Sequence, residues 1–541
     1  GQWVDEAVAA LSAMDNVTLR TRCTGAGVYD HGYVLADEKV ADHTPGDGRP
    51  KHRLWRIRAG KILTATGAIE RPLSFAGNDI PGVMLAAAVR DYVVNYAVSP
   101  GDRTVIVTNN DDAYRTAIAL KEAGLEVPAI IDARATVSGD LPAKARAMGI
   151  RIEAGRGIAK VKGGKRVTGV SICLQAGEGS VLDEIACDAV AMSGGWSPVV
   201  HLFSHCGGKL IWDNVNAHFR PDATRPPLNH DGAAMVYAAG NANGAMSAAA
   251  ALADADAQAR VAVAALGGAA VDAAVSQAAA VNEQPMDAVW IMPQGATAAL
   301  KAKMWLDYQN DVKVSDVQLA AREGYESVEH TKRYTTLGMA TDQGKLSNIN
   351  GLAVLAGSLN ADIPQVGTTT FRPPYTPVTL GALAGESRGE IFQPLRKTPM
   401  HGWHEAKGAY LEPVGLWRRP YCFPRTGETH EQAVHREVLN TRSALGLLDA
   451  STLGKIIVKG PDAGKFLDML YTGVMSTLPV GKCRYGLMCN EQGFLSDDGV
   501  VARIDEDTWL CHTTSGGADR IHAWMEDWLQ CEWWDWKVYT A

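Results

Sequence analysis

KILTATGAIERPLSFAGNDIPGVM, residues 61–84, is the stretch around which the front of this chain is organised. An apolar strand that contains Ile62 and Leu63 runs into the small residues Ala65-Thr66-Gly67, and a proline-rich descent follows. Small residues at the carboxyl end of a strand let another backbone, or a dinucleotide, come close. Taken alone, the ATG triplet is equally typical of an ordinary strand-to-loop turn, and the longer string is the more specific signal.

The composition describes a globular protein with an ample core. The chain has 541 residues, of which 46% are hydrophobic and 21% charged, so about three or four domains are expected. A net charge of −8 and a pI near 6.0 give no electrostatic reason to expect nucleic acid. The sequence contains no run of about 18 apolar residues and predicts no membrane span. Nine cysteines without a C-x-x-C pair suggest reduced thiols in a cytoplasm-like compartment.

The two ends of the sequence suggest an internal fragment of a longer protein. The chain begins at Gly1, without Met and directly in an amphipathic pattern, and it ends in an unfinished strand pattern at 536–541. We therefore expect a longer open reading frame, and we expect the fragment alone to be inactive.

A second βαβ unit follows the opening stretch. Strand, helix and strand succeed one another over 104–132 in the order of a Rossmann unit, and Asp132 stands where a ribose-binding acid would be. The phosphate turn, Thr108–Asp112, has no glycine and puts two carboxylates where a pyrophosphate needs bare backbone amides. We interpret Asp111 or Asp112 as the N-cap of the helix, and the unit as structural.

Two later stretches repeat the pattern of the first. Cys187–Pro198 is an apolar strand that runs into small residues and then proline. Val236–Gly244 contains a strand that ends in Gly240-Asn241, and a helix is predicted directly after it over Ala245–Leu266. A helix N-terminus beside such glycines is a sensible anion cradle. The three stretches in this order predict an α/β, Rossmann-like fold with two dinucleotide-binding domains, whose G-x-G-x-x-G turn would lie before Gly1.

These strands resemble those of the glutathione-reductase-like flavoproteins and related amine oxidases, in which the last strand ends in Gly-Asp at the cofactor. Asn241 replaces that Asp here. A different region follows at 286–396. Its string SVEHTKRYTTLGMATDQGK, residues 327–345, resembles small helical modules that bind a [2Fe–2S] cluster through four cysteines. The comparable places hold other residues, namely Asp307, Gln309, Asp342 and Ser347. Without thiolates no such cluster can be held, so we interpret the module as a structural relic.

A hairpin is predicted at 481–500, where an Asn-Glu-Gln-Gly turn separates two strands. The return strand starts with Asp497-Asp498, although carboxylates are poor strand formers. Neighbouring strand residues point to opposite faces, which suggests one solvated acid and one acid in a pocket; a loop with two exposed acids is the alternative. We interpret His401 and His404 as surface or capping residues, and no metal site is predicted.

The hairpin closely resembles the folate-binding domain of the aminomethyltransferases, the T proteins of glycine cleavage. With the dinucleotide fold and the cysteine-free module before it, the whole chain resembles the α subunits of heterotetrameric sarcosine oxidases. The resemblance implies a first dinucleotide domain made of 1–100 and 190–285, and a second, Rossmann-like domain at 101–189. It further implies a helical module with linker at 286–396 and the N-terminal part of an α+β aminomethyltransferase-like domain at 397–541.

The resemblance also implies a chemistry. Sarcosine is oxidatively demethylated to glycine on FAD in a β subunit, electrons pass to FMN at the α/β interface, and O2 is reduced to H2O2. The one-carbon unit reaches tetrahydrofolate in the α subunit and gives 5,10-methylenetetrahydrofolate. The implied partners are β, γ and δ subunits of a cytoplasmic heterotetramer besides the small-molecule substrates, and NAD is the implied occupant of the first dinucleotide site.

The family's contacts can be carried onto matching positions of this chain. For NAD they fall on Val28, Thr66, Gly67, Gly240, Asn241 and Met246. For folate they fall on Tyr485, Asp497, Asp498 and Thr514. A carboxylate near the attacking amine can accept its proton and stabilise a cationic iminium, so Asp497 and Asp498 are both predicted as catalytic, with no choice between them.

Two other hypotheses stay open. The chain could be an α-like subunit of a related amine or opine dehydrogenase, without one-carbon transfer; the folate-type domain argues against this. It could also be a non-catalytic scaffold whose pockets serve assembly, against which the pair of acids argues weakly.

Overall fold

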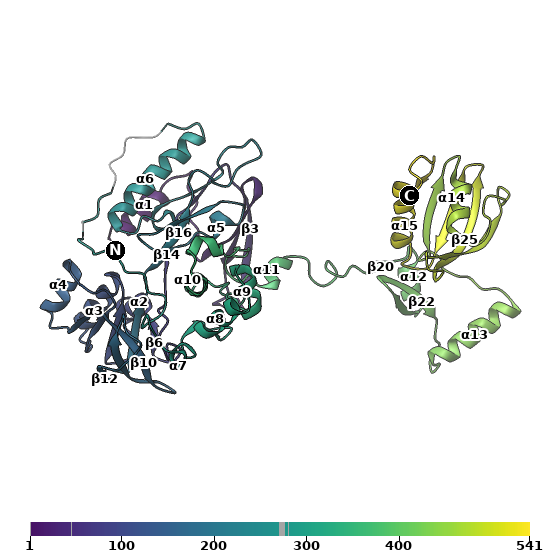
Figure 1. The fold of residues 1–541 in the computed structure, drawn as a ribbon. Helices are drawn as coiled ribbons and strands as arrows, with labels where there is room; N and C mark the ends of the chain where they lie inside the picture. The colour runs from purple at the N-terminus through teal and green to yellow at the C-terminus, as the bar shows by residue number, and fades with distance from the viewer. Residues whose placement is uncertain (1, 45, 270–275, 280) are drawn as a thin grey trace. The chain divides into compact units, whose positions relative to one another are not determined.

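The computed structural model describes residues 2–44, 46–269, 276–279 and 281–541. The chain divides into two compact units, Gly1–Leu383 (unit 1) and Ala384–Ala541 (unit 2), and each is described by itself. Figure 1 shows helices and strands mixed in both units. The α/β class predicted from the sequence is therefore confirmed. Within the described residues, no helix is long and apolar enough to cross a membrane.

A five-stranded parallel sheet forms the middle of unit 1. Its strands in spatial order are β6 (Val83–Leu85), β13 (Ala189–Ser193), β7 (Thr104–Thr108), β8 (Ile130–Asp132) and β9 (Ile152–Ala154). Along β7, Val105 and Val107 pack into one hydrophobic cluster and Ile106 into another, because successive side chains point to opposite faces. Both faces of the sheet are buried, which explains the continuous apolar run of this strand.

Helices pack on one face of this sheet and an antiparallel sheet on the other (Figure 1). The helices are α2 (Ala86–Tyr96), α3 (Asp112–Glu122) and α4 (Asp140–Ala147). The antiparallel strands are β10 (Arg156–Gly163), β11 (Val167–Leu174) and β12 (Asp183–Ile185). This arrangement is the layered α/β architecture that the strand–helix–strand order predicts.

The start of α3 corrects one detail of the sequence interpretation. Asp111 occupies the N-cap position, but its side chain accepts no hydrogen bond from the first turn. Instead, Asn110 Oδ1 accepts from the backbone N–H of Asp112 at 3.0 Å. The Asp111 carboxylate turns to the Arg134 guanidinium, 2.7 Å away, because a charge-assisted pair is stronger than a bond to a neutral amide.

The opening stretch, residues 61–84, brings the predicted motif stretches together. Its strands pair as follows: β4 (Ile62–Thr64) in parallel with β17 (Val236–Ala238), and β5 (Ala68–Glu70) antiparallel with β14 (Trp196–Pro198). Leu73 and Phe75 are then fully buried in the core beside the five-stranded sheet, which the stretch joins as β6. The stretches that share a sequence pattern therefore share one region of the fold.

Further helices and strands of unit 1 lie outside the five-stranded sheet and the two layers that cover it. They are α1 (Gln2–Ser12), β1 (Cys23–Tyr29), η1 (Asp30–Gly32), β2 (Tyr33–Lys39), β3 (His52–Arg58), α5 (His201–Ser204), β15 (Leu210–Asp213), β16 (His218–Pro221), η2 (Gly240–Asn243), α6 (Ala248–Ala265), α7 (Ala298–Lys301), β18 (Trp305–Asp307), β19 (Val312–Lys313), α8 (Val314–Arg322), α9 (Val328–Thr335), α10 (Asn348–Leu359), η3 (Ile363–Val366) and α11 (Leu380–Ala384). The predicted helix after Gly244 begins at Ala248, because the hydroxyl of Ser247 caps it by accepting from Ala250 N–H at 3.2 Å.

Unit 2 is built on a second five-stranded sheet, ordered β24-β25-β26-β23-β27. Its elements are β20 (Arg396–Lys397), α12 (His401–Ala406), β21 (Tyr410–Val414), β22 (Trp417–Cys422), α13 (His430–Ser443), β23 (Gly454–Lys459), α14 (Ala463–Leu470), β24 (Cys483–Cys489), β25 (Leu495–Asp505), β26 (Thr508–Thr513), α15 (Ala518–Cys531) and β27 (Tyr539–Thr540). Residues of α14 and α15 share one hydrophobic cluster with the sheet. The predicted hairpin is confirmed: β24 and β25 pair antiparallel on either side of the Asn-Glu-Gln-Gly turn.

Candidate functional site

The four folate-type residues predicted from the sequence form two separate pairs in unit 2. Asp497 lies with Thr514, and Asp498 lies with Tyr485. The two acids are neighbours in β25, so their side chains leave the strand on opposite faces. The two pairs therefore have different surroundings and different chemistry.

Asp497 is an enclosed carboxylate whose side chain is 0% exposed. Its Oδ1 accepts from the backbone N–H groups of Asp498 and Thr514, at 2.8 and 3.0 Å. Its Oδ2 accepts from the Thr514 hydroxyl at 3.1 Å and from Arg520 Nη2 at 3.2 Å. A carboxylate has about four acceptor positions. Donors within the protein therefore fill the acceptor positions of Asp497.

A glycine at the start of α15 makes room for that carboxylate. A Cβ on Gly517 would lie 2.4 Å from Asp497 Oδ2, closer than a side chain allows. Arg520, in the first turn of α15, also donates to the Ser496 hydroxyl and carbonyl, each at 2.8 Å. Asp497 therefore fastens β25 to the N-terminal end of α15.

The sequence reasoning did not identify Gly517 and Arg520. A positive charge in the first turn of a helix interacts unfavourably with the helix dipole. The position of Arg520 could therefore have indicated that this side chain has a specific anionic partner.

Asp498 presents its carboxylate on the other face of the hairpin. Its Oδ2 accepts a hydrogen bond from the Tyr485 hydroxyl, and this bond raises the pKa of Tyr485 above its ordinary value. Tyr485 is 60% exposed, and Leu487, which pairs with Asp498 across the hairpin, is also exposed. This acid and this phenol therefore form an accessible polar pair beside an exposed apolar side chain.

The NAD-type residues predicted from the sequence gather around β4 and β17. Because these strands pair in parallel, their carboxyl ends bring Thr66 and Gly67 beside Gly240 and Asn241. The Thr66 hydroxyl donates to Val199 O at 2.8 Å, and Gly67 O accepts from Val199 N–H at 2.9 Å. Gly67 has a φ of +76°, and a Cβ there would meet no atom within 4 Å. This open glycine fits the close approach of a dinucleotide.

Gly240 does not fit the anion cradle expected of it. Its backbone N–H already donates to Asp254 Oδ2 at 2.8 Å, and Asn243 Nδ2 donates to Asp254 Oδ1 at 3.0 Å. The Asp254 carboxylate thus stands where a phosphate would accept. Asn241 Nδ2 closes its own turn by donating to Ala245 O at 2.7 Å and Met246 O at 3.2 Å.

Val28, the remaining NAD-type residue, lies in β1. Its side chain is 1% exposed and packs in a cluster with Val236 and Ala238 of β17. Because the whole residue is buried, Val28 presents neither its side chain nor its backbone to a ligand.

The cysteine-free module is held together by polar groups where the resemblance places cysteines. Asp307 is buried, and its carboxylate accepts from the backbone N–H groups of Gln309, Asn310 and Gly338 at 2.9, 3.0 and 2.7 Å. Gln309 Oε1 accepts from Asp342 N–H at 3.2 Å. Three of the four positions are therefore linked through hydrogen bonds, which supports a structural role for the module.

The interpretation of His401 and His404 as surface or capping residues is wrong, because both residues are buried in α12 and each pairs with a carboxylate. His404 Nε2 lies 2.8 Å from Asp449 Oδ2, and both side chains are buried. His401 Nε2 lies 3.3 Å from Glu405 Oε1 on the same helix. Among the described residues, no three His, Cys, Asp or Glu side chains come close enough to hold a metal ion.

Glu70, in the opening stretch, gives a prediction about pH. It is 3% exposed, its Oε2 accepts from Ala87 N–H at 2.8 Å, and burial raises its pKa from 4.5 to about 7. Between these values the unfolded chain ionises Glu70 and the folded chain does not, so stability falls as the pH rises towards 7. Glu70→Gln is expected to raise the free energy of unfolding at pH 8 by about 3 kcal/mol and to change little at pH 4.

Denaturant unfolding at the two pH values measures this effect. Glu122→Gln, at a side chain that is 57% exposed, serves as the matched control and should change neither value appreciably. An unchanged pH dependence in Glu70→Gln would contradict the assignment.

Comparisons with known proteins agree with this arrangement. Residues 400–540 match the family model described as GCVT N-terminal domain, and residues 301–386 match the sarcosine oxidase A3 domain. The sarcosine oxidase subunit alpha of Corynebacterium sp. (strain P-1) is 42% identical over 98% of this chain and 55% of its own length. That of Rhizobium meliloti (strain 1021) is 42% identical over 97% of this chain and 51% of its own length. The chain thus spans about half the length of the curated relatives it matches.

A solved structure shows the same fold for much of the chain. The L-proline dehydrogenase from P. horikoshii superposes with a TM-score of 0.52 at 20% identity, covering 71% of this chain and 68% of that one. Fold and comparisons together define a chain in which an α/β unit with a parallel sheet precedes a unit that matches the GCVT N-terminal domain. Over nearly its whole length the chain is similar to about half of each of these sarcosine oxidase α subunits, and residues 301–386 match their A3 domain.

Proposed function

We propose that this chain is part of the α subunit of a sarcosine oxidase. The complex would convert sarcosine to glycine and H2O2 and pass the one-carbon unit to tetrahydrofolate as 5,10-methylenetetrahydrofolate. The observation that carries the proposal is the presence in one chain of the A3-type module and the GCVT-type unit, at 42% identity to sarcosine oxidase α subunits.

The proposed assembly follows the family. FAD would lie in a β subunit, FMN at the α/β interface, and γ and δ subunits would complete a cytoplasmic heterotetramer. NAD would lie against Thr66, Gly67 and the end of β17. The free space at the Cβ position of Gly67 supports this site. Gly240 would add no hydrogen bond to the ligand, because its N–H already donates to Asp254. We also propose that the chain has four domains: a first dinucleotide domain (1–100 with 190–285), a second Rossmann-like domain (101–189), a helical module with linker (286–396) and an aminomethyltransferase-like domain (397–541).

Asp498 is the acid that we assign to one-carbon transfer. When bound, tetrahydrofolate would supply the attacking amine nitrogen. Asp498 would accept the proton from that nitrogen and stabilise positive charge beside it, and the Tyr485 hydroxyl would hold the carboxylate in place. Asp497 has its oxygens engaged by protein donors, so its role would be to position the strand that carries Asp498.

The central test uses the full-length subunit produced together with its partner subunits. Sarcosine-dependent oxygen uptake and methylenetetrahydrofolate formation are measured on the same preparation. The proposal predicts both. Oxidation of another secondary amine without folate coupling would favour the amine or opine dehydrogenase alternative, and neither activity would favour a scaffold.

Tyr485→Phe provides a finer test of the site. Losing the hydroxyl leaves the aromatic ring in place but frees the Asp498 carboxylate, so folate coupling is expected to fall about tenfold, from the loss of one hydrogen bond to a charged group. Tyr410→Phe is the control, since Tyr410 is 43% exposed on β21 and its ring stacks on His430. Equal coupling in Tyr485→Phe and in the wild type would remove this tyrosine from the site.

A further inference from the structure

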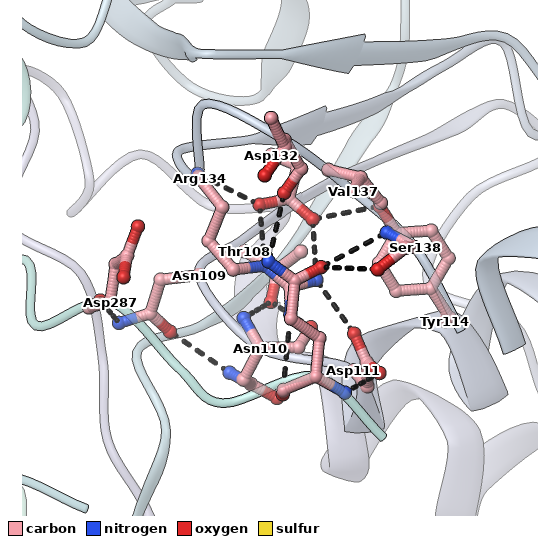
Figure 2. A network of polar contacts seen from close by, with 12 residues as sticks. Thr108, Asn109, Asn110, Asp111, Tyr114, Asp132, Arg134, Val137, Ser138 and Asp287 are labelled. Carbon is pink, nitrogen blue, oxygen red and sulfur yellow. Dashed lines mark hydrogen bonds and ion pairs between the residues drawn. The ribbon is translucent and has the colours of Figure 1, made fainter. Parts of the chain in front are cut away.

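The phosphate turn of the second Rossmann-like region is filled by side chains of the protein itself. β7 and β8 pair in parallel with Thr108 opposite Asp132, so the turns that follow them meet at one edge of the sheet. There the Arg134 guanidinium lies between Asp111 Oδ1 and Asp132 Oδ2, 2.7 Å from each (Figure 2). All three side chains are at most 2% exposed.

Asp132 stands where a ribose-binding acid would be, but its carboxylate already accepts hydrogen bonds from other residues of the protein. Its Oδ2 also accepts from the Tyr114 hydroxyl at 2.8 Å, and its Oδ1 accepts from the backbone N–H and Nε of Arg134, at 2.9 and 3.1 Å. Burial raises the pKa of Tyr114 above its ordinary value, which keeps that hydroxyl a donor. A ribose would have to displace these partners.

A distant stretch of backbone, residues 282–287, lies against this cluster. Gln284 donates its backbone N–H to Asp111 Oδ2 at 2.8 Å. Its side-chain amide binds the loop after β8 in both directions: Oε1 accepts from Ser138 N–H at 3.0 Å, and Nε2 donates to Thr136 O at 3.0 Å. Gln284 therefore occupies hydrogen-bonding groups at this edge of the sheet, and they are not free to bind a nucleotide.

Both ends of residues 282–287 are also fixed by paired bonds. Asn282 N–H donates to Asp140 Oδ2 at 3.0 Å, and Asn282 O accepts from Asp140 N–H at 3.2 Å. Asp287 N–H donates to Asn109 O at 3.3 Å, and Asp287 O accepts from Asn109 Nδ2 at 2.7 Å. These reciprocal pairs tie the segment to the end of β7 and to the start of α4, each more than a hundred residues away in the chain.

One glycine is shaped to the segment. Gly139 precedes α4 with a φ of +107°, and a Cβ there would lie 2.7 Å from Asn282 O. The groove therefore admits the backbone of the segment only because this position has no side chain.

We propose that residues 282–287 are the permanent occupant of the second dinucleotide groove, which takes no nucleotide. Two carboxylates and one guanidinium leave a net negative charge where a pyrophosphate would bind. The segment meets this charge with a neutral donor, the backbone N–H of Gln284. The region would then serve as a dock for the chain that leads to the helical module. The inference is independent of sarcosine oxidation and of the proposed NAD site near Gly67.

Hydrogen exchange on the full chain tests the proposal through a peptide covering residues 281–289. The backbone amides of Gln284 and Asp287 are expected to exchange slowly, and NADH or NADPH should not change their rates or those of 108–112. A nucleotide-dependent change in either place, or unprotected exchange of the segment, would overturn the proposal. Nucleotide protection near Gly67 alone would leave it standing.

Gly139→Ala should displace the segment and speed exchange over 281–289 by about tenfold, a local opening worth about 1.4 kcal/mol. Gly324→Ala is the matched control, because Gly324 has a φ of +94° but no atom within 4 Å of its Cβ position. Gln284→Ala, which removes the three side-chain bonds to Thr136 and Ser138, gives the same readout should Gly139→Ala misfold. Unchanged exchange in Gln284→Ala would contradict the proposal.

Discussion

Asp498→Asn in the assembled, full-length enzyme is expected to abolish the capture of the one-carbon unit and to spare the oxidation of sarcosine. The asparagine keeps the size of the side chain and a bond to Tyr485, but it cannot accept a proton or balance a positive charge. Loss of general acid–base chemistry costs roughly 10²–10⁴-fold, so methylenetetrahydrofolate formation should fall by that factor while oxygen uptake persists.

Asp497→Asn is expected to behave differently. Asparagine would turn a donor group towards Thr514 or Arg520, so the bonds that fasten β25 to α15 would be broken. We expect this variant to lose about 1–3 kcal/mol of the stability of unit 2, with coupling reduced only as far as the strand shifts.

Asp505→Asn, at an exposed acid further along the same strand, is the control for both variants. Coupling, oxygen uptake and denaturant unfolding are measured together on each. Normal folate coupling in Asp498→Asn would exclude this residue as the proton acceptor, and loss of coupling confined to Asp497→Asn would reverse the assignment.

Arg134→Met is expected to be the most destabilising single change in unit 1. It removes the positive charge between Asp111 and Asp132 and leaves two buried carboxylates unpaired. Breaking a buried ion pair in this way costs about 3–5 kcal/mol, because the remaining charges cannot reach water. The free energy of unfolding of the full chain, measured in denaturant, should fall by that amount.

Arg151→Met is the matched control. Arg151 also bridges two carboxylates, Glu153 at 2.7 Å and Asp183 at 2.8 Å, but its side chain is 47% exposed. Exposed pairs are worth about 1 kcal/mol or less, so the control should unfold nearly as the wild type does. Equal losses in the two variants would show that burial does not set the strength of the Arg134 cluster.

Much of the fold was predictable because it rests on local patterns. The apolar strands that end in small residues, at 61–67, 187–198 and 236–244, were predicted to share one fold, and two of them pair directly with the opening stretch. The Asn-Glu-Gln-Gly turn likewise predicted the hairpin of unit 2. Strand alternation and turn chemistry act between residues a few positions apart, so they can be read along the chain.

The candidate sites were predicted only in part. Alternation placed Asp497 and Asp498 on opposite faces, but only the packing of α15 shows which face is closed. Gly240 was predicted to cradle an anion, and Asp254 from the next helix takes its amide instead. These outcomes depend on which element covers which surface, and burial of that kind leaves little trace in the local sequence.

The sequence alone determined the α/β class, the loss of the phosphate-binding glycines at Thr108–Asp112, and the hairpin that carries the two acids. Only the tertiary structure decided that residues 282–287 return to the groove of the second Rossmann-like region, and that Arg134 pairs with both of its carboxylates. The opening stretch 61–84 illustrates both kinds of information. Its strands are predicted by the local pattern, whereas the strands they pair with are known only from the tertiary structure. Local backbone preferences act within a turn or a strand, whereas desolvation and charge pairing depend on residues that are distant in the chain and become neighbours on folding.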